Sequence, residues 1–243
     1  MPTEVCTLST PAELFQSAAE DFLILARESI HARGRFTVAL SGGSTPKNLY
    51  SLLATLPNIP WDKILFFFGD ERDVASDDPE SNFRMANAAL LSKAPIPQHN
   101  IFRVRTEMRD AEAAALDYEQ TIQKVFGLQP GQLPRFDLIF LGMGPDGHTA
   151  SLFPGTTALQ ENRRIFVANW VEKFHTHRLT LTLPVINHAA CVTFLVVGQD
   201  KAPMVHQVLQ EKNPSLPSAQ VLPTDGRLLW LLDNAAAAGL HAA

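Results

Sequence analysis

The pattern of apolar and polar residues divides the chain into helix-like stretches and short apolar runs. Residues 11–31 carry Leu14, Phe22 and Leu25 on one face at helical spacing, which predicts an amphipathic helix. Short runs of consecutive apolar residues, bounded by glycine or polar residues, predict buried strands. These runs cover residues 35–40, 63–68, 136–141, 191–197 and 227–232.

The remaining segments complete this alternation. Residues 178–183 alternate apolar and polar side chains, which is typical of a half-exposed strand. The turn after residue 40 leads to Pro46, which suits the first position of a following helix. Further helices are expected over residues 81–91, with Ser81 as a cap, over 109–126, over 201–210 and in the alanine-rich tail.

Apolar strands separated by helices predict an α/β fold: a mostly parallel, Rossmann-like sheet with helices on both faces. We expect residues 1–243 to form one domain, because the loop-like proline-rich stretch at 213–223 lies too near the end to divide the chain. Ligands of such sheets bind beyond the carboxyl ends of the strands. Candidate chemistry is therefore expected just after Leu40, Phe68, Leu141, Leu183 and Val197.

Composition narrows the class of protein. Apolar residues make up 46% and charged residues 19%, and the formal net charge is −5, which argues against nucleic acid or an anionic membrane as a partner. The two cysteines, Cys6 and Cys191, suggest a reducing compartment, although a disulfide between them stays open. The first residues lack the basic start and apolar stretch of a signal peptide, and the apolar runs are too short to span a membrane. We therefore expect a soluble cytoplasmic protein.

The loop after residue 40 has the composition of an anion site. Gly42 and Gly43 let the backbone approach a ligand closely, and Ser44 and Thr45 add hydroxyl and N–H donors before a helix N-terminus. The alternative is a tight turn in which Ser44 or Thr45 only caps the helix. The loop is not a P-loop, because it lacks the Gly-Lys-Ser/Thr ending.

The loop after residue 68 is unusually charged for a segment that follows three phenylalanines. Arg72 could hold a phosphate with two hydrogen bonds. Asp70 or Glu71 could bind a sugar hydroxyl or hold Arg72 in place. A solvated loop is the alternative, since charged runs are usually exposed.

The third loop, residues 142–149, offers one imidazole. Its glycines match the dinucleotide pattern G-x-G-x-x-G, but Asp146 would face a pyrophosphate and Pro154 would interrupt the required helix. His148 suits a general base, with Asp146 fixing its tautomer. The alternative is a structural or surface histidine; His175 and His177, like the histidine at position 188, lack such a glycine-rich setting.

Two further cations follow predicted strand positions. Arg178 opens the alternating strand, and Lys201 stands at the start of a predicted helix. Either could be a solvated charge. Together they could instead complete a cationic pocket in a protein that is acidic as a whole.

These segments, in this order, resemble the 6-phosphogluconolactonase family. The Asp146–Pro154 stretch is the most specific piece, and the resemblance runs through most of the chain. The matching segments are Ser41–Pro46, Gly69–Arg72, Asp78–Asn82, Gly142–Pro154, Arg178–Thr182 and Gly198–Lys201. The resemblance implies hydrolysis of 6-phosphoglucono-δ-lactone to 6-phosphogluconate in the oxidative pentose phosphate pathway, on a sheet related to glucosamine-6-phosphate deaminases and ribose-5-phosphate isomerases.

On this resemblance we expect direct hydrolysis without a metal, cofactor or covalent intermediate. His148 would activate water, Asp146 would orient the imidazole, and backbone N–H groups of the glycine-rich loops would stabilise the oxyanion. The 6-phosphate would be held by Gly42, Gly43, Ser44, Thr45, Arg72, Arg178 and Lys201, with Asp70 as a further substrate-binding residue. We expect a monomer or weak homodimer.

Two alternatives to the lactonase remain. Glucosamine-6-phosphate deaminases are similar in the same segments, but they carry an acidic residue where this chain has Phe153, which cannot transfer a proton. A non-catalytic sugar-phosphate-binding protein would need only the cations, so the presence of both Asp146 and His148 argues against it.

Overall fold

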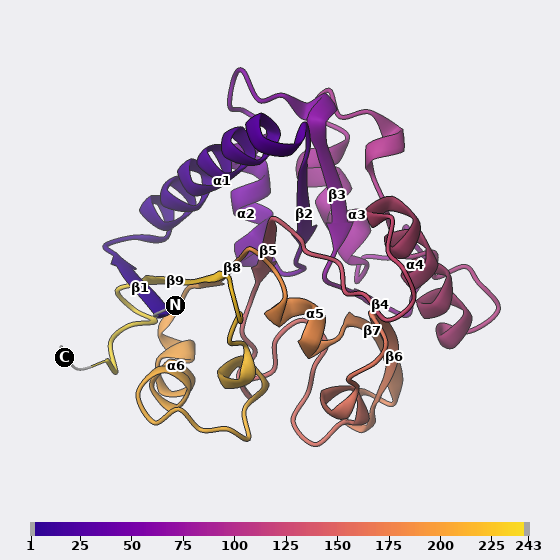
Figure 1. The fold of residues 1–243 in the computed structure, drawn as a ribbon. Helices are drawn as coiled ribbons and strands as arrows, with labels where there is room; N and C mark the ends of the chain where they lie inside the picture. The colour runs from indigo at the N-terminus through magenta and orange to yellow at the C-terminus, as the bar shows by residue number, and fades with distance from the viewer. Residues whose placement is uncertain (1–2, 241–243) are drawn as a thin grey trace.

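The computed structural model describes residues 3–240, which form a large parallel sheet, a small antiparallel sheet and flanking helices (Figure 1). The strands are β1 (Thr3–Leu8), β2 (Phe36–Leu40), β3 (Ile64–Phe68), β4 (Asp70–Arg72), β5 (Leu138–Leu141), β6 (Phe166–Val171), β7 (Thr176–Leu181), β8 (Cys191–Val196) and β9 (Arg227–Asp233). The main helices are α1 (Pro11–Arg33), α2 (Ser44–Leu53), α3 (Asn82–Ala86), α4 (Ala111–Phe126), α5 (Leu183–Asn187) and α6 (Ala202–Leu209).

The large sheet confirms the predicted α/β class. Its six strands run in the order β1-β9-β8-β5-β2-β3, and every neighbouring pair is parallel. Apolar side chains cover both of its faces: α1, α2 and α3 pack on one face, and α4, α5 and α6 pack on the other. Burial on both faces explains why the central strands read as unbroken apolar runs.

The predicted helix ends are set by local hydrogen bonds. Thr10 caps α1 by accepting from the N–H of Glu13, and Gly34 ends the helix in the left-handed conformation at φ 75°. Ser81 caps α3 as predicted, accepting from the N–H of Arg84. No helix within residues 3–240 is long and apolar enough to cross a bilayer.

A separate antiparallel sheet, in the order β4-β7-β6, corrects one expectation. Residues 178–183 were expected to form a strand of the main sheet that ends, at Leu183, at the edge where ligands bind. They lie instead in β7, which pairs antiparallel with β4 and β6, and Leu183 begins α5. The small sheet lies beside the large one (Figure 1). Local alternation predicts a strand but carries no information about its partner.

Other differences lie at the ends of elements. The segment around Cys6, for which no strand was predicted, forms the edge strand β1 beside β9. The predicted helix in the alanine-rich tail is wrong: residues 234–239 form turns, in which Asp233 accepts from the N–H of Ala236. Residues 241–243 lie outside the described part of the chain. Helix α2 begins at Ser44, so Pro46 occupies its third position and not its first.

Candidate active site

A cleft of about 240 Å³ opens at the carboxyl ends of β2, β5 and β8, where a parallel sheet is expected to bind its ligand. The structure brings most of the predicted site residues into its wall. Those that line it are Gly42, Gly43, Ser44, Thr45, Asp70, Arg72, His148 and Lys201. Asp146 and Arg178 are not among the lining residues. Asp146 contacts His148, and Arg178 lies opposite Arg72 in the register of β4 and β7.

The loop that contains Gly42 and Gly43 places the N-terminus of α2 at the cleft. Gly43 is the N-cap at φ 104°, a conformation that favours glycine, and no side chain caps the helix. A Cβ on Gly42 would lie 1.9 Å from Oδ1 of Asn82, so this position has no room for a side chain. The residue before the loop is fixed by Tyr50, whose hydroxyl accepts from the N–H of Ser41 at 2.8 Å. Because neither Ser44 nor Thr45 caps α2, the first amides of the helix favour an anion in the cleft.

The buried Glu71 carboxylate holds the charged loop against α3. It accepts from the backbone N–H groups of Arg72, Asn82 and Phe83 at 2.7–2.8 Å and from the hydroxyl of Ser81. Burial raises the pKa of Glu71 above its usual value despite these hydrogen bonds. Of the roles considered for Glu71, the structure therefore favours holding Arg72 in place over binding a ligand.

Asp70 faces the cleft through a carboxylate that is already hydrogen-bonded. Its Oδ1 accepts from the Asn82 amide at 3.1 Å, and its Oδ2 accepts from the Ser151 hydroxyl at 2.6 Å. Both partners are buried and come from distant segments. Asn82 and Ser151 lie in segments that carry the family resemblance, but the sequence contains no local signal that joins them to Asp70.

His148 and Asp146 form the predicted pair. Nδ1 of His148 lies 2.5 Å from Oδ1 of Asp146, and the His148 side chain is 25% exposed. Oδ2 of Asp146 accepts from Nζ of Lys173 at 3.3 Å, a contact that sequence reasoning missed. Burial alone would raise the pKa of Asp146, but hydrogen bonds from His148 and Lys173, with the charge of His148, hold it below its usual value. An ionised carboxylate can only accept, so Nδ1 is the donor, and in the neutral imidazole Nε2 is the acceptor.

The loop around His148 is shaped to hold the imidazole in one place. Its ring stacks on Phe153 with centroids 4.2 Å apart and planes at 26°. On Gly144, an added Cβ would lie 2.0 Å from the His148 ring, so only glycine fits beside it. Gly147 adopts φ 74°, and its carbonyl accepts from the N–H and the hydroxyl of Ser218. Packing and hydrogen bonds therefore restrict the ring on several sides.

Three cationic side chains, Arg72, Arg178 and Lys201, lie at the cleft or next to it. Arg72 donates to a carboxylate oxygen of Glu80 at 3.3 Å, and Nζ of Lys201 lies 3.2 Å from Asp200. Arg178 is directly opposite Arg72 in the β4–β7 register, so both side chains emerge on one face of the small sheet. Burial and the positive charge of Arg72 lower the pKa of Arg178. Arg72 and Lys201 thus line the same cleft as the N-terminus of α2, each with a carboxylate partner, in a protein of net charge −5.

The residues around the cleft offer a base, cations and hydroxyl groups. Within residues 3–240, no group of three or more His, Cys, Asp or Glu side chains is arranged to hold a metal ion. The arrangement can bind a phosphate near α2 and present a neutral imidazole nitrogen to a water molecule.

The chain is similar to a known protein family over most of its length. The sequence profile of the family described as glucosamine-6-phosphate isomerases/6-phosphogluconolactonase matches residues 9–230. The chain is 48% identical over 215 residues to a 6-phosphogluconolactonase of a Nostoc species, covering 87% of this chain and 88% of that protein. It is 39% identical over 242 residues to the 6-phosphogluconolactonase of Rattus norvegicus, covering 97% of this chain and 93% of that protein.

Solved structures give the same result. The structure of 6-phosphogluconolactonase from Trypanosoma cruzi superimposes with a TM-score of 0.90 at 32% identity, covering 99% of this chain and 98% of that one. A monomeric glucosamine-6-phosphate deaminase superimposes with a TM-score of 0.81 at 23% identity, covering 98% of this chain and 100% of that one. The second likeness shows a shared fold alone.

Proposed function

The chain belongs to the family of glucosamine-6-phosphate isomerases and 6-phosphogluconolactonases, and we propose that it hydrolyses 6-phosphoglucono-δ-lactone to 6-phosphogluconate in the oxidative pentose phosphate pathway. Relatives that carry the lactonase name match most of the chain. The observation that carries the proposal is the His148–Asp146 pair at the wall of a cleft that also holds the α2 N-terminus, Arg72 and Lys201.

The binding step follows from the charges around the cleft. The 6-phosphate lies against the amides of Gly42 and Gly43 and the first amides of α2, at Ser44 and Thr45, and is neutralised by Arg72, Arg178 and Lys201. Asp70 faces the sugar hydroxyls through the lone pairs that Asn82 and Ser151 leave free. This arrangement directs the lactone carbonyl toward His148.

The chemical step uses the imidazole as a general base. Nε2 of His148 takes a proton from water as the oxygen attacks the lactone carbonyl carbon, and Asp146 stabilises the imidazolium that forms. Backbone N–H groups of the glycine-rich loops stabilise the oxyanion. The ring oxygen then leaves as the 5-hydroxyl and takes the proton back from the imidazolium, which restores the neutral base.

The surroundings of His148 disfavour the deaminase alternative. Phe153 occupies the position where that activity needs an acidic residue, and it is buried against the imidazole ring. A phenyl ring cannot carry a proton between the atoms of an amino sugar. The same stacking supports a fixed base for a single water molecule.

We extend the proposal to the compartment and the oligomeric state of the protein. We place the protein in the cytoplasm as one domain over residues 1–243, acting as a monomer or weak homodimer on a small sugar-phosphate lactone. Both Cys6 and Cys191 are free thiols, which suits a reducing compartment.

The test is the rate of hydrolysis of freshly generated 6-phosphogluconolactone, corrected for its spontaneous hydrolysis. We expect His148→Ala to lower kcat about 10²- to 10⁴-fold, while the affinity for 6-phosphogluconate stays close to that of the wild type. Ammonia release from glucosamine 6-phosphate is measured in parallel. Ammonia release without accelerated lactone opening would overturn the proposal, and unchanged turnover in the variant would remove His148 as the base.

A further inference from the structure

The turn of the β6–β7 hairpin brings an exposed aromatic ring next to the site. The turn is a single 3-10 segment, Glu172–Phe174, followed by His175 in the left-handed conformation at φ 48°. Phe174 is 43% exposed. Core packing therefore does not account for an aromatic residue at this position, and its contacts point toward the site.

Phe174 contacts both the catalytic and the phosphate-binding side of the site. Its ring meets Phe153 in a T-shaped arrangement, with centroids 5.7 Å apart and planes at 77°. Phe153 in turn stacks on His148 at 4.2 Å. The guanidinium of Arg178 lies over the Phe174 ring, 5.2 Å from its centroid. A single ring thus touches the cation of the phosphate site and the residue that supports the base.

The Phe174 ring supports a guanidinium that is incompletely hydrogen-bonded. Within residues 3–240, the buried Nε of Arg178 has no hydrogen-bond acceptor, and the charges of Asp70, Glu80 and Glu71 favour the cation. Burial and the like charge of Arg72 both act against this guanidinium. The negative face of an aromatic ring is an attractive surface for a cation, and it leaves the N–H donors free for an anion.

Lys173, the neighbouring residue, reaches the site from the same turn. Its Nζ donates to Oδ2 of Asp146 at 3.3 Å, on the side opposite to His148. The two residues of the turn therefore contact Asp146, Phe153 and Arg178 together. Removal of the Phe174 ring would loosen both the base and the phosphate cation.

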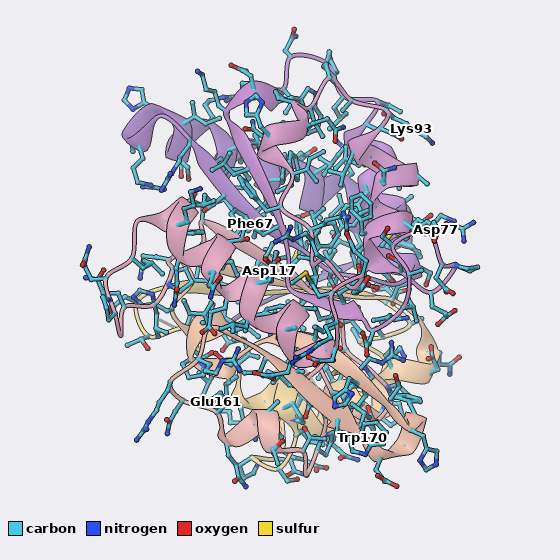
Figure 2. The ribbon with its side chains drawn as sticks, turned by 90° about the vertical axis from the view of Figure 1, so that its right-hand side faces the viewer. Phe67, Asp77, Lys93, Asp117, Glu161 and Trp170 are labelled. Atoms are coloured by element: carbon cyan, nitrogen blue, oxygen red, sulfur yellow. The ribbon has the colours of Figure 1, made fainter. Side chains whose placement is uncertain are left out.

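Trp170 on the same hairpin provides the comparison. Trp170, labelled in Figure 2, is 46% exposed, its ring packs on His177 at 5.0 Å, and its Nε1 donates to Glu172. Neither contact reaches the His148–Asp146 pair or Arg178. Trp170 is thus an exposed aromatic residue of the same hairpin whose ring contact and hydrogen bond go to other side chains, although it lines a hollow together with Asp146 and Phe153.

We propose that Phe174 is a positioning residue for lactone hydrolysis: its face holds Arg178 toward the phosphate, and its T-shaped contact with Phe153 holds that ring against His148. The inference rests on the proposed function. It assigns two effects to the Phe174 ring, one on the affinity for the phosphorylated ligand and one on kcat. Loss of the contact with Arg178 weakens binding of the phosphate, and loss of the contact with Phe153 lowers kcat.

The experiment compares Phe174→Leu, Phe174→Tyr and the control Trp170→Ala. Leucine keeps apolar volume but removes the aromatic face and edge, whereas tyrosine keeps both. For Phe174→Leu we expect affinity for 6-phosphogluconate to fall about two- to fivefold and kcat to fall about two- to tenfold. Phe174→Tyr and Trp170→Ala are expected to match the wild type in both, and melting temperatures report on folding.

Each outcome separates the role of the ring from the function itself. An active wild type with a Phe174→Leu variant equal to it in kcat and in product affinity would overturn the role of Phe174. Equal losses in the leucine and tyrosine variants would also overturn it, since packing at that position rather than the aromatic ring would then matter. A wild type that does not accelerate lactone hydrolysis would overturn the proposed function, while product affinity would still test the contact with Arg178.

Discussion

Gly144 gives the sharpest test of how His148, the proposed base, is held. A Cβ added at this position would lie 2.0 Å from Cε1 and Nδ1 of His148. Carbon atoms pack best at about 3.5–4.0 Å, so the ring has to move by about 1.5 Å. Phe153 stacks on the imidazole and leaves little room for this movement. The displaced ring loses its 2.5 Å contact with Asp146.

The expected size of the effect follows from this displacement. A misplacement of about 1 Å at a reacting centre can cost about 10²-fold in rate, and full loss of general-base assistance costs about 10²- to 10⁴-fold. Gly144→Ala should therefore lower kcat by at least about 10²-fold while affinity for 6-phosphogluconate changes little. The assay is hydrolysis of fresh 6-phosphogluconolactone, corrected for the spontaneous reaction.

A matched glycine and a double variant make this test specific. Gly69→Ala places a Cβ 3.5 Å from the carbonyl oxygen of Leu40, an ordinary contact, and should keep kcat near that of the wild type. Added to His148→Ala, the Gly144→Ala change should cost no further activity, because the ring that it displaces is absent. A folded Gly144→Ala variant with the kcat of the wild type would refute the reasoning.

Three further substitutions test other parts of the structure. Arg72→Ala should raise KM for the lactone about 10- to 100-fold through loss of a charge-assisted phosphate contact; steady-state kinetics with an unchanged KM would contradict that role. Glu71→Gln should lower the free energy of unfolding by about 1–3 kcal/mol in urea titrations, because the amide nitrogen cannot accept from the backbone N–H groups that the carboxylate binds. The hydrogen bonds from Arg103 lower the pKa of Glu107 to about 2 from its usual 4.5. The stability from this pair is therefore present above pH 4.5 and lost as the pH falls toward 2. The free energy of unfolding of the wild type, from urea titrations, should exceed that of Glu107→Gln by up to about 1 kcal/mol at pH 7, and the two should be equal near pH 2. A difference in stability that does not depend on pH would contradict this sign.

The hydrophobic pattern determined the class of fold and the location of the chemistry. Strands such as Phe36–Leu40 and Cys191–Val196 are buried on both faces, and such burial requires an unbroken apolar run that is visible in one dimension. Because parallel strands end at one edge, the loops after Leu40 and Leu141 had to converge. The pair His148 and Asp146 is two residues apart, so local sequence already implied their contact.

The partners of these residues depended on the tertiary structure. Asp70 is held by Asn82 and Ser151, Arg178 lies opposite Arg72, and no local period predicts such pairings. The small sheet was missed for the same reason, because alternation in Thr176–Leu181 indicates a strand without indicating its neighbours.

The sequence by itself thus determined a parallel α/β sheet, its ligand edge, and a histidine with a nearby carboxylate. Only the tertiary structure decided what holds that histidine: Phe153 on its face, Gly144 beside its ring and Lys173 behind Asp146. The physical reason is the range of the interactions. Backbone propensity and burial act through neighbours in the chain, whereas the placement of a base depends on side chains that only folding brings into contact.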